Sequence, residues 1–389
     1  MDEAKIRRTL YVVSTLGFLH IFGHSMLIPI LSLFMVDLGA TVLLVGVVYP
    51  MLSIIHFSLG FLTGSLSDAF GRIPLIKIGM LIFSISCLFG YFALDVWWVL
   101  ILLIMMGVAM AFLWPTIQAA IADLFPPGEM GEGIGKLELI SLIGMFIGPL
   151  VTAISIERVG YRGMFLMSFL TGLVGFVASF LLTKESSRVD SSVKGKKFIA
   201  EIRFFPKFFR NRGVLSPSLA AFFYSFSIAV VQLYYPLIAS DRGLSISEIS
   251  ITMMLWNSSF ILIPFVGRLS DRIGRVLPIV TSLWGACLLL LAAYFAQGFT
   301  AFAILLFLLG ITKNTLMPVS IAQVAEESEA TMHGAGLGVR MTFNQLGKVI
   351  SYGIMALTLT FGISTLFRVA ALGCLIGSFI YTFTLKYRN

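Results

Sequence analysis

Long apolar stretches separated by short groups of charged residues dominate the pattern along this chain. The first stretch, from Thr9 to Val36, contains no Asp, Glu, Lys or Arg. Ionised side chains are costly at the centre of a bilayer and collect between spans, so the charges mark where each span ends. A spanning helix needs roughly 20 mostly apolar residues. On this basis we predict twelve helical segments, at 9–36, 42–67, 75–94, 96–122, 139–156, 163–183, 214–240, 249–267, 276–296, 299–323, 337–361 and 365–385.

Composition supports this interpretation. Of the 389 residues, 58% are apolar and only 12% are charged, whereas soluble domains are roughly half apolar and about a quarter charged. The apolar surplus must face lipid, which excludes a soluble globular domain and predicts an all-α integral membrane protein in a lipid bilayer. The three cysteines lie inside apolar runs and are odd in number, so we expect no disulfide framework, no zinc or other metal site and no cofactor.

The net charge of +8 has a simple explanation in a membrane protein. If both termini are cytoplasmic, only four of the 27 Lys and Arg residues lie in loops on the outer side: Arg158, Arg162, Arg242 and Arg368. This asymmetry follows the positive-inside rule. We therefore predict a multi-pass protein of the plasma membrane with both termini cytoplasmic, and no nucleic-acid partner.

A basic linker divides the predicted spans into two groups of six. Residues 184–213 carry nine positive and three negative side chains, and the aromatic stretch 198–209 has the pattern of an amphipathic helix lying on the membrane surface. We predict an N-terminal six-helix bundle at 1–183, this cytoplasmic linker at 184–213, and a C-terminal six-helix bundle at 214–389.

The two halves contain an internal repeat. The stretch Gly64–Arg72 recurs as Gly267–Arg275, an offset of 203 residues (267 minus 64). The same offset relates Gly107 to Gly310 and Gly144 to Gly347. Two related bundles predict a pseudo-two-fold axis along the membrane normal, with a substrate site between them near the midplane.

The repeated stretch resembles a signature of the major facilitator superfamily, the G-x-L-x-D-x-x-G-R loop between its second and third helices. The resemblance covers essentially the whole chain and implies twelve helices in two pseudo-symmetric bundles. It also implies that these loops latch the bundles together on the cytoplasmic side; the alternative is that they are only tight solvated turns. The gating-loop residues so implied are Gly64, Asp68, Gly71, Arg72, Gly267, Asp271, Gly274 and Arg275.

The fifth segment is similar to a helix-five signature found in exporters and antiporters of that superfamily. The matching residues are Gly135, Gly144, Gly148 and Pro149. Glycines at this spacing let helices pack closely. Where the family pattern ends in two more glycines, this chain has Thr152 and Ala153. The resemblance therefore favours export, and these two departures from the pattern weaken the evidence for that direction.

A third sequence feature of the family is missing from this chain. Proton-linked members usually carry an arginine four residues before the glycine that matches Gly107, and this chain has Leu103 there. Proton coupling by that route is not supported, although the proton remains a candidate coupling ion. The second half instead has Lys313, three residues after Gly310. A lysine within a span is a functional candidate because it is expensive to place there.

Polar residues within the spans form the predicted substrate cavity. On the eleventh segment Arg340, Asn344, Lys348 and Ser351 recur on one helical face. The full set of cavity candidates is His20, His24, Gln232, Asn257, Lys313, Arg340, Asn344 and Lys348.

The charged members of this set are all positive, which favours an anionic or carboxylate-bearing substrate in a low-dielectric cavity. The alternatives are that Lys313 and Lys348 extend toward the membrane surface, serve only helix packing, or pair with one of the acidic residues Glu138, Glu326 and Glu327.

The spacing of His20 and His24 permits a metal, but no third ligand is evident on that face. Hydrogen bonding in the cavity or proton handling is the better interpretation of the pair.

These observations predict a secondary active transporter that moves a small organic solute by alternating access and works as a monomer. It is not expected to be an enzyme, because no carboxylate pair or nucleophile–base set lies within the spans. The pattern Gly131–Lys136 lacks the earlier glycine and the Ser or Thr of a phosphate-binding loop, so an ion or substrate gradient must supply the energy. The alternatives are a multidrug-type exporter of lipophilic compounds and a non-transporting membrane sensor that retains the fold.

Overall fold

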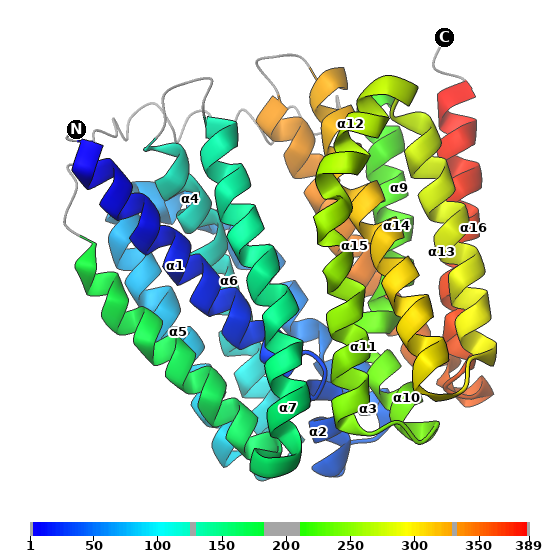
Figure 1. Ribbon diagram of the computed structural model, residues 1–389, viewed down its shortest axis with the longest axis horizontal. Coiled ribbons are helices and arrows are strands. Elements are labelled where there is room, and N and C mark those ends of the chain that lie inside the picture. Colours follow the sequence, from blue (N-terminus) through cyan, green and yellow to red (C-terminus); the bar gives the residue numbers. More distant parts are fainter. Residues whose placement is uncertain (1–2, 125–129, 183–210, 329–332, 387–389) are drawn as a thin grey trace. The chain divides into compact units, whose positions relative to one another are not determined.

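The computed structural model describes residues 3–124, 130–182, 211–328 and 333–386, and these residues form helices with no strand among them (Figure 1). The first half contains α1 (Glu3–Leu27), α2 (Leu31–Asp37), α3 (Val42–Val48), α4 (Pro50–Phe70), α5 (Arg72–Phe92), α6 (Val96–Ala122), α7 (Met130–Ala178) and the 3-10 helix η1 (Ser179–Leu181). The second half contains α9 (Arg212–Leu233), α10 (Tyr235–Asp241), α11 (Ile246–Ser258), η2 (Ser259–Leu262), α12 (Ile263–Ile273), α13 (Val276–Phe295), α14 (Gly298–Glu327), α15 (His333–Thr358), η4 (Leu359–Phe361) and α16 (Thr365–Lys386).

The prediction of an all-α membrane protein is confirmed, since ten helices in the described part of the chain are long and apolar enough to cross a membrane. One of the ten, 135–181, covers the predicted fifth and sixth segments, and its chain changes direction at Gly160, where φ is 66°. The eleventh segment corresponds to α15, which is not among the ten. Arg340, Asn344 and Lys348 lower its hydropathy. The number twelve therefore stays a prediction.

Several predicted segments are divided in the structure. Segment 9–36 becomes α1 and α2, separated by a turn at 28–30 that contains Pro29. Segment 42–67 divides before Pro50, and 214–240 divides before Tyr235–Pro236. Segment 249–267 is interrupted by η2, which precedes Pro264. Proline lacks the backbone N–H that continues a helical ladder, so these breaks follow from the sequence although the apolar pattern conceals them.

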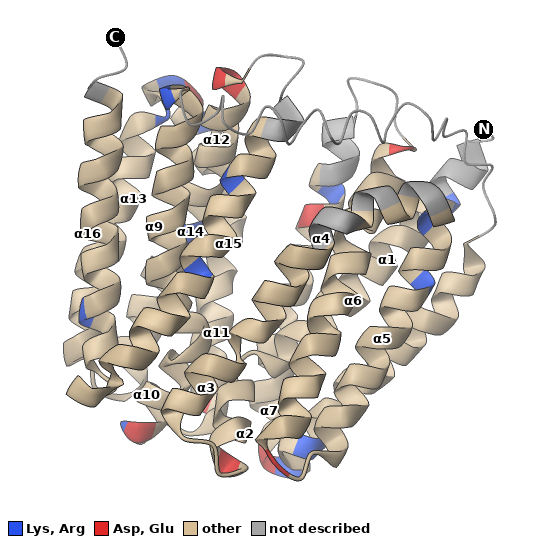
Figure 2. Ribbon diagram, turned by 180° about the vertical axis from the view of Figure 1, so that it is seen from behind, with Lys and Arg blue, Asp and Glu red and all other residues tan. Residues whose placement is uncertain are grey.

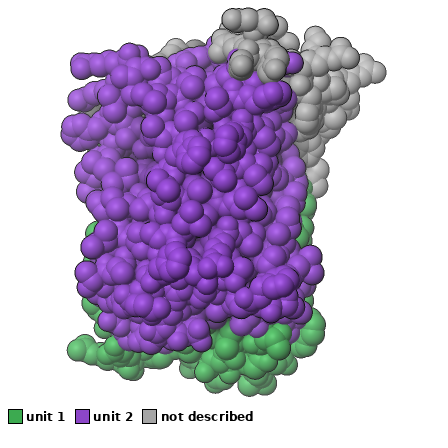
Figure 3. Space-filling view, turned by 90° about the vertical axis from the view of Figure 1, so that its right-hand side faces the viewer, with its two compact units in different colours: residues 1–41, 51–195 green, residues 42–50, 196–389 purple. Residues whose placement is uncertain are grey.

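Contacts between Cα atoms divide the chain into two compact units (Figure 3). Unit 1 comprises residues 1–41 and 51–195, and unit 2 comprises 42–50 and 196–389. Helix α3 therefore belongs to unit 2, where it packs on α15 and the Tyr49 ring meets the Tyr352 ring edge-on. The predicted boundaries at 183 and 214 stay a prediction, and most of the predicted linker, with its amphipathic helix, lies outside the described residues.

The internal repeat extends to the packing within each unit. In unit 1, α1 packs along α7, and α5 packs on α6 and α7. In unit 2, α9 packs along α15 and α16, and α13 packs on α14 and α16. A Cβ on Gly144 would lie 3.3 Å from the Phe18 carbonyl oxygen of α1, and a Cβ on Gly347 would collide with the Phe222 carbonyl of α9. Equivalent glycines thus permit the same close helix contact in both units.

Charged residues lie mainly at helix ends (Figure 2), and many large side chains exposed on the helices are apolar. Large apolar side chains such as Val177, Leu288 and Phe379 are about 60% exposed. Surfaces of this kind are expected against lipid tails rather than water. The cores of the units instead contain polar side chains, and these form the candidate site.

Candidate functional site

A half-buried lysine lies at the centre of the candidate site in unit 2. Lys313 extends from α14 and its Nζ donates a hydrogen bond to Oδ1 of Asn257 on α11, at 3.0 Å. The same Nζ lies 4.4 Å from the centroid of the Trp256 ring, a cation–π contact. Trp256 and Asn257 are both buried. The ammonium group is therefore held by neutral partners rather than by a carboxylate.

Close packing of α11 on α14 makes these contacts possible. Gly310 lies one turn before Lys313, and a Cβ at this position would collide with the Trp256 carbonyl and with the Ser259 side chain. Asn314, next to Lys313, donates to Ser259 Oγ at 2.8 Å. Hydrogen bonds thus join α11 and α14 on both sides of the lysine.

A second lysine faces the first. Lys348 on α15 is half-buried and close enough to Lys313 for the two positive charges to repel each other. Neither lysine takes part in an ion pair among the residues that the structure describes. Glu326, one of the expected acidic partners, instead binds Arg275.

The third cation among the cavity candidates, Arg340, contacts α14. Its Nε donates to Ser320 Oγ at 2.9 Å, and its Nη2 donates to the Met317 carbonyl oxygen at 3.0 Å. Asn344, one turn further along α15, donates to Ser225 Oγ of α9. The polar stripe predicted on this segment therefore faces α9 and α14, and Arg340 has neutral partners like those of Lys313.

Gln232 lies near the end of α9, where it contacts a cluster of tyrosines. Its Oε1 accepts a hydrogen bond from the Tyr352 hydroxyl at 3.4 Å. Tyr234 donates to the Tyr352 carbonyl oxygen at 3.3 Å, and a Cβ on Gly46 of α3 would collide with the Tyr234 hydroxyl. This cluster joins α3, α9 and α15.

Unit 1 contains histidines instead of lysines. His20 on α1 is 0% exposed, and neither of its ring nitrogens has a hydrogen-bond partner among the described residues. Its ring meets Phe83 of α5 edge-on at 4.8 Å and lies 6.4 Å from the His24 ring. His56 of α4 is a further electrostatic neighbour. In the described part of the chain no group of three His, Cys, Asp or Glu residues is arranged to hold a metal.

The helix-five residues hold α7 against α1. A Cβ on Gly148 would lie 2.9 Å from the Met26 amide nitrogen. Thr152, which stands where the family pattern has glycine, donates its hydroxyl to the Met26 carbonyl oxygen at 2.7 Å. Where a glycine would only let the helices approach closely, Thr152 joins α7 to α1 by a direct hydrogen bond. Around Gly135, by contrast, a Cβ would meet nothing within 4 Å.

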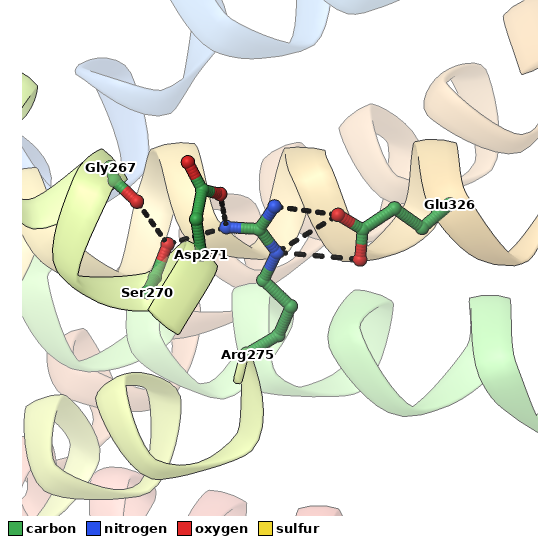
Figure 4. A network of polar contacts seen from close by, with 5 residues as sticks. All are labelled: Gly267, Ser270, Asp271, Arg275 and Glu326. Carbon is green, nitrogen blue, oxygen red and sulfur yellow. Dashed lines mark hydrogen bonds and ion pairs between the residues drawn. The ribbon is translucent and has the colours of Figure 1, made fainter. Parts of the chain in front are cut away.

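One repeated loop motif builds an ion-pair network in unit 2 (Figure 4). Arg275 binds Asp271 Oδ1 and Glu326 Oε1, each at 2.6 Å, and also donates to Ser270 Oγ. The hydrogen bond with Glu326 raises the pKa of the Arg275 guanidinium above its usual value. Gly274, with φ of 84°, ends α12 directly before this arginine in a conformation that favours glycine.

The equivalent network in unit 1 joins α4, α5 and α6. Arg72 donates to Ser67 and to Asp123 Oδ2, the latter at 3.2 Å. Each of these residues lies 203 positions before its counterpart in unit 2, as 123 to 326 shows. Gly71 has a φ of 89°, like Gly274. The side chain of Asp68 and the surroundings of Gly64 lie outside the described residues.

Three of the four arginines predicted for the outer loops contact carbonyls or rings. Arg242 donates to the carbonyls of Ala293, Tyr294 and Ala296 and to Ser364 Oγ, at 2.6–2.9 Å. Burial lowers the pKa of its guanidinium. In addition, Arg162 donates to the Ala93 carbonyl at 3.2 Å, and Arg368 lies 3.7 Å from the Tyr294 ring centroid.

Sequence reasoning missed several participants. Trp256 was hidden among the many apolar residues of its segment. Four partners of the two loop arginines were also missed: Ser67, Asp123, Ser270 and Glu326. The 203-residue offset contains the signal that could have found them, because it aligns Ser with Ser and Asp with Glu.

The chain is similar to membrane transporters along its length. The sequence model of the Major Facilitator Superfamily matches residues 13–256 and 217–389. An uncharacterized MFS-type transporter of Methanocaldococcus jannaschii is 24% identical, over 95% of this chain and 96% of that protein. Multidrug resistance protein MdtG of Escherichia fergusonii is 28% identical, over 95% of this chain and 92% of that protein.

Solved structures show the same fold. A bacterial homolog of the human lysosomal transporter Spinster, in an inward-facing and occupied conformation, has a TM-score of 0.80 at 14% identity, covering 99% of this chain and 98% of that one. The peptide transporter POT in complex with sulfate has a TM-score of 0.77 at 14% identity, covering 97% and 94%.

Proposed function

Because the chain belongs to the Major Facilitator Superfamily and is a multi-pass membrane transporter, we propose that it is a secondary active exporter or antiporter of small anionic, carboxylate-bearing organic solutes. The observation that carries the proposal is the ammonium group of Lys313, which extends from a membrane-spanning helix, contacts the neutral side chains of Asn257 and Trp256, and is repelled by Lys348.

The hydrogen-bonding capacity of this site suits a carboxylate. An ammonium group has three donors, and Lys313 directs one to Asn257. A carboxylate only accepts hydrogen bonds. An anion would therefore satisfy the remaining donors of Lys313 and relieve the repulsion between Lys313 and Lys348, which is strong in a low-dielectric interior.

The rest of the assignment follows from the family and the charge pattern. We place both termini in the cytoplasm and the protein in the plasma membrane, by the positive-inside rule. The two units would alternate access to the solute, with the Arg72 and Arg275 networks acting at the cytoplasmic side. Export is supported by the helix-five glycines and by relatives named multidrug resistance proteins. We expect a monomer to suffice.

A multidrug-type exporter of lipophilic compounds is the second candidate. The observation that favours it is that several relatives are named multidrug resistance protein MdtG. In that case Lys313 and Lys348 would stabilise helix packing, and their charge would not contribute to solute binding.

Substitution of Lys313 by Gln separates these two functions, since Gln removes the charge but keeps a polar side chain. We expect p-aminohippurate, an organic anion, to raise the melting temperature of the wild-type protein by mass action and to be transported into liposomes. Lys313→Gln should lose both effects. Lys77→Gln is the matched control, because Lys77 lies on α5 in unit 1 and contacts Phe180. If ethidium, a lipophilic cation, stabilises wild type and Lys313→Gln equally while p-aminohippurate stabilises neither, the anion proposal is wrong.

A further inference from the structure

The last turns of α7 in unit 1 carry an open apolar groove. It has a volume of about 370 Å³ and is lined by Leu173, Val174, Val177 and Ala178. Leu173, Val174 and Val177 are exposed, and the groove lies near the end of a helix that is long and apolar enough to cross a membrane. Lipid rather than water should therefore surround it.

The opposite face of α7 fixes this orientation. A Cβ on Gly172 would lie 2.9 Å from the Ser84 Cα of α5, and a Cβ on Gly175 would collide with the Met80 side chain of the same helix. These two glycines let α7 and α5 pack closely. The residues that line the groove lie on the other side of α7 and face away from α5.

Two basic side chains from neighbouring helices lie near the end of this groove. The 3-10 helix η1 continues directly from α7, and the Nζ of Lys77 on α5 lies 4.3 Å from the centroid of its Phe180 ring. Arg8 of α1 donates from Nη2 to the Leu181 carbonyl oxygen at 3.4 Å. Leu181 follows Val177 by four residues, so both cations lie about one turn beyond the groove.

The charge of Lys77 has no compensation within the described part of the chain. Neither Lys77 nor Arg8 forms an ion pair there. The internal repeat shows that packing does not require a charge at this position, because the 203-residue offset (280 minus 77) pairs Lys77 with Val280 of α13. Both residues are half-buried. A lysine in a spanning helix is a functional candidate, and its charge points to an anionic ligand.

An acidic phospholipid matches this arrangement of groups. Its acyl chain is apolar like the groove, and its phosphate is a group that both Arg and Lys bind. Acidic lipids give the cytoplasmic leaflet its negative potential, and the charge pattern places this end of α7 on the cytoplasmic side. The linker at 184–213 is a poorer occupant, because its nine positive and three negative side chains would be repelled by the same two cations.

We propose that Arg8, Lys77 and the groove of α7 hold one acidic phospholipid of the cytoplasmic leaflet. The phosphate lies between the guanidinium of Arg8 and the ammonium of Lys77, and one acyl chain follows Val174 and Val177 along the helix. The site goes beyond the proposed function. It lies in unit 1 and shares no residue with the Lys313 site, and its test requires no transport.

Native mass spectrometry of delipidated protein in detergent measures the site directly. Wild type should bind a first phosphatidylglycerol at least tenfold more tightly than phosphatidylcholine with the same acyl chains, because the second lipid has no net charge. The double variant Arg8→Gln/Lys77→Gln should lose this preference. Lys136→Gln/Arg158→Gln is the matched control, since it removes the same two charges from exposed positions elsewhere on α7, and it should keep the preference. Equal affinities of wild type for the two lipids, or equal phosphatidylglycerol affinities of the two double variants, would overturn the proposal.

The groove is tested without a change of charge. Val177→Trp fills it and should weaken phosphatidylglycerol binding at least threefold, whereas Leu288→Trp, at an exposed position of α13 in unit 2, should not. Unchanged binding by Val177→Trp would show that the lipid lies elsewhere. If phosphatidylglycerol binds only after residues 198–209 are replaced by a Gly–Ser sequence, the linker occupies the groove and the proposal is wrong.

Discussion

The packing of α11 on α14 predicts that adding one methyl group will disturb the Lys313 site without touching it. In Gly310→Ala, the new Cβ would lie 3.0 Å from the Trp256 carbonyl carbon and still closer to its oxygen. Ordinary contact begins at 3.4 Å, and the contact with the oxygen is far shorter, so α11 must move away from α14. The obstacle is backbone, which no rotamer change relieves. Overpacking of this kind costs about 1–3 kcal/mol.

The displacement should reach the candidate site because Asn257 follows Trp256 directly. Its Oδ1 lies 3.0 Å from Lys313 Nζ, and moving α11 outward lengthens this bond. A hydrogen bond to a charged group contributes about 1.5–3 kcal/mol. Partial loss of it should weaken binding of p-aminohippurate about tenfold, which is 1.4 kcal/mol.

Two control variants separate packing from binding. Gly107→Ala is the equivalent change in unit 1, where a Cβ would lie 2.8 Å from the Leu52 carbonyl oxygen; it should destabilise the protein similarly but leave anion affinity unchanged. Gly353→Ala on α15 meets nothing within 4 Å and should change neither quantity. Stability is measured by SDS titration in mild detergent, and affinity by equilibrium binding. Stability and affinity of Gly310→Ala equal to those of Gly353→Ala would refute the reasoning.

Two further substitutions test contacts that the sequence did not reveal. Thr152→Val keeps the shape of the side chain but removes its hydrogen bond to the Met26 carbonyl, and should lower the free energy of unfolding by about 0.6 kcal/mol, the average for such bonds between membrane helices; an unchanged value in SDS titration would count against the bond. Arg242→Lys loses the planar fork that reaches the α13 carbonyls and Ser364. We expect a loss of about 2 kcal/mol, with Arg158→Lys as the control, and an equal melting temperature for both variants would contradict it.

Much of the architecture could be predicted from the sequence because few backbone structures can span a bilayer. Backbone groups must be satisfied within a spanning segment, so long apolar stretches become helices. The repeat at 203 residues predicted related halves, and packing of Gly144 and Gly347 against the backbones of α1 and α9 shows the same relation in space. The divided segments at Pro29 and Pro50 were missed because hydropathy does not detect a missing N–H donor.

Only some residues of the candidate site could be predicted from the sequence. Lys313 stood out because a charge in an apolar run is conspicuous, and Asn257 was found as a polar residue within a span. Their hydrogen bond joins α14 to α11 across 56 positions, a separation that no periodicity reveals. Trp256 could not be distinguished from residues that face lipid. Glu326 was considered only as a partner of the lysines, whereas the structure pairs it with Arg275.

The sequence by itself determined the membrane class, the helical content, the repeat and the family resemblance, because each of these depends on local hydropathy or on residues at fixed spacing. The tertiary structure alone decided which polar groups meet. It placed Lys313 against an amide and an indole, directed Arg340 to Ser320, and enclosed His20 beside Phe83 without a hydrogen-bond partner among the described residues. Such contacts depend on which helices pack together and in what rotation, and side chains far apart in the chain set that packing.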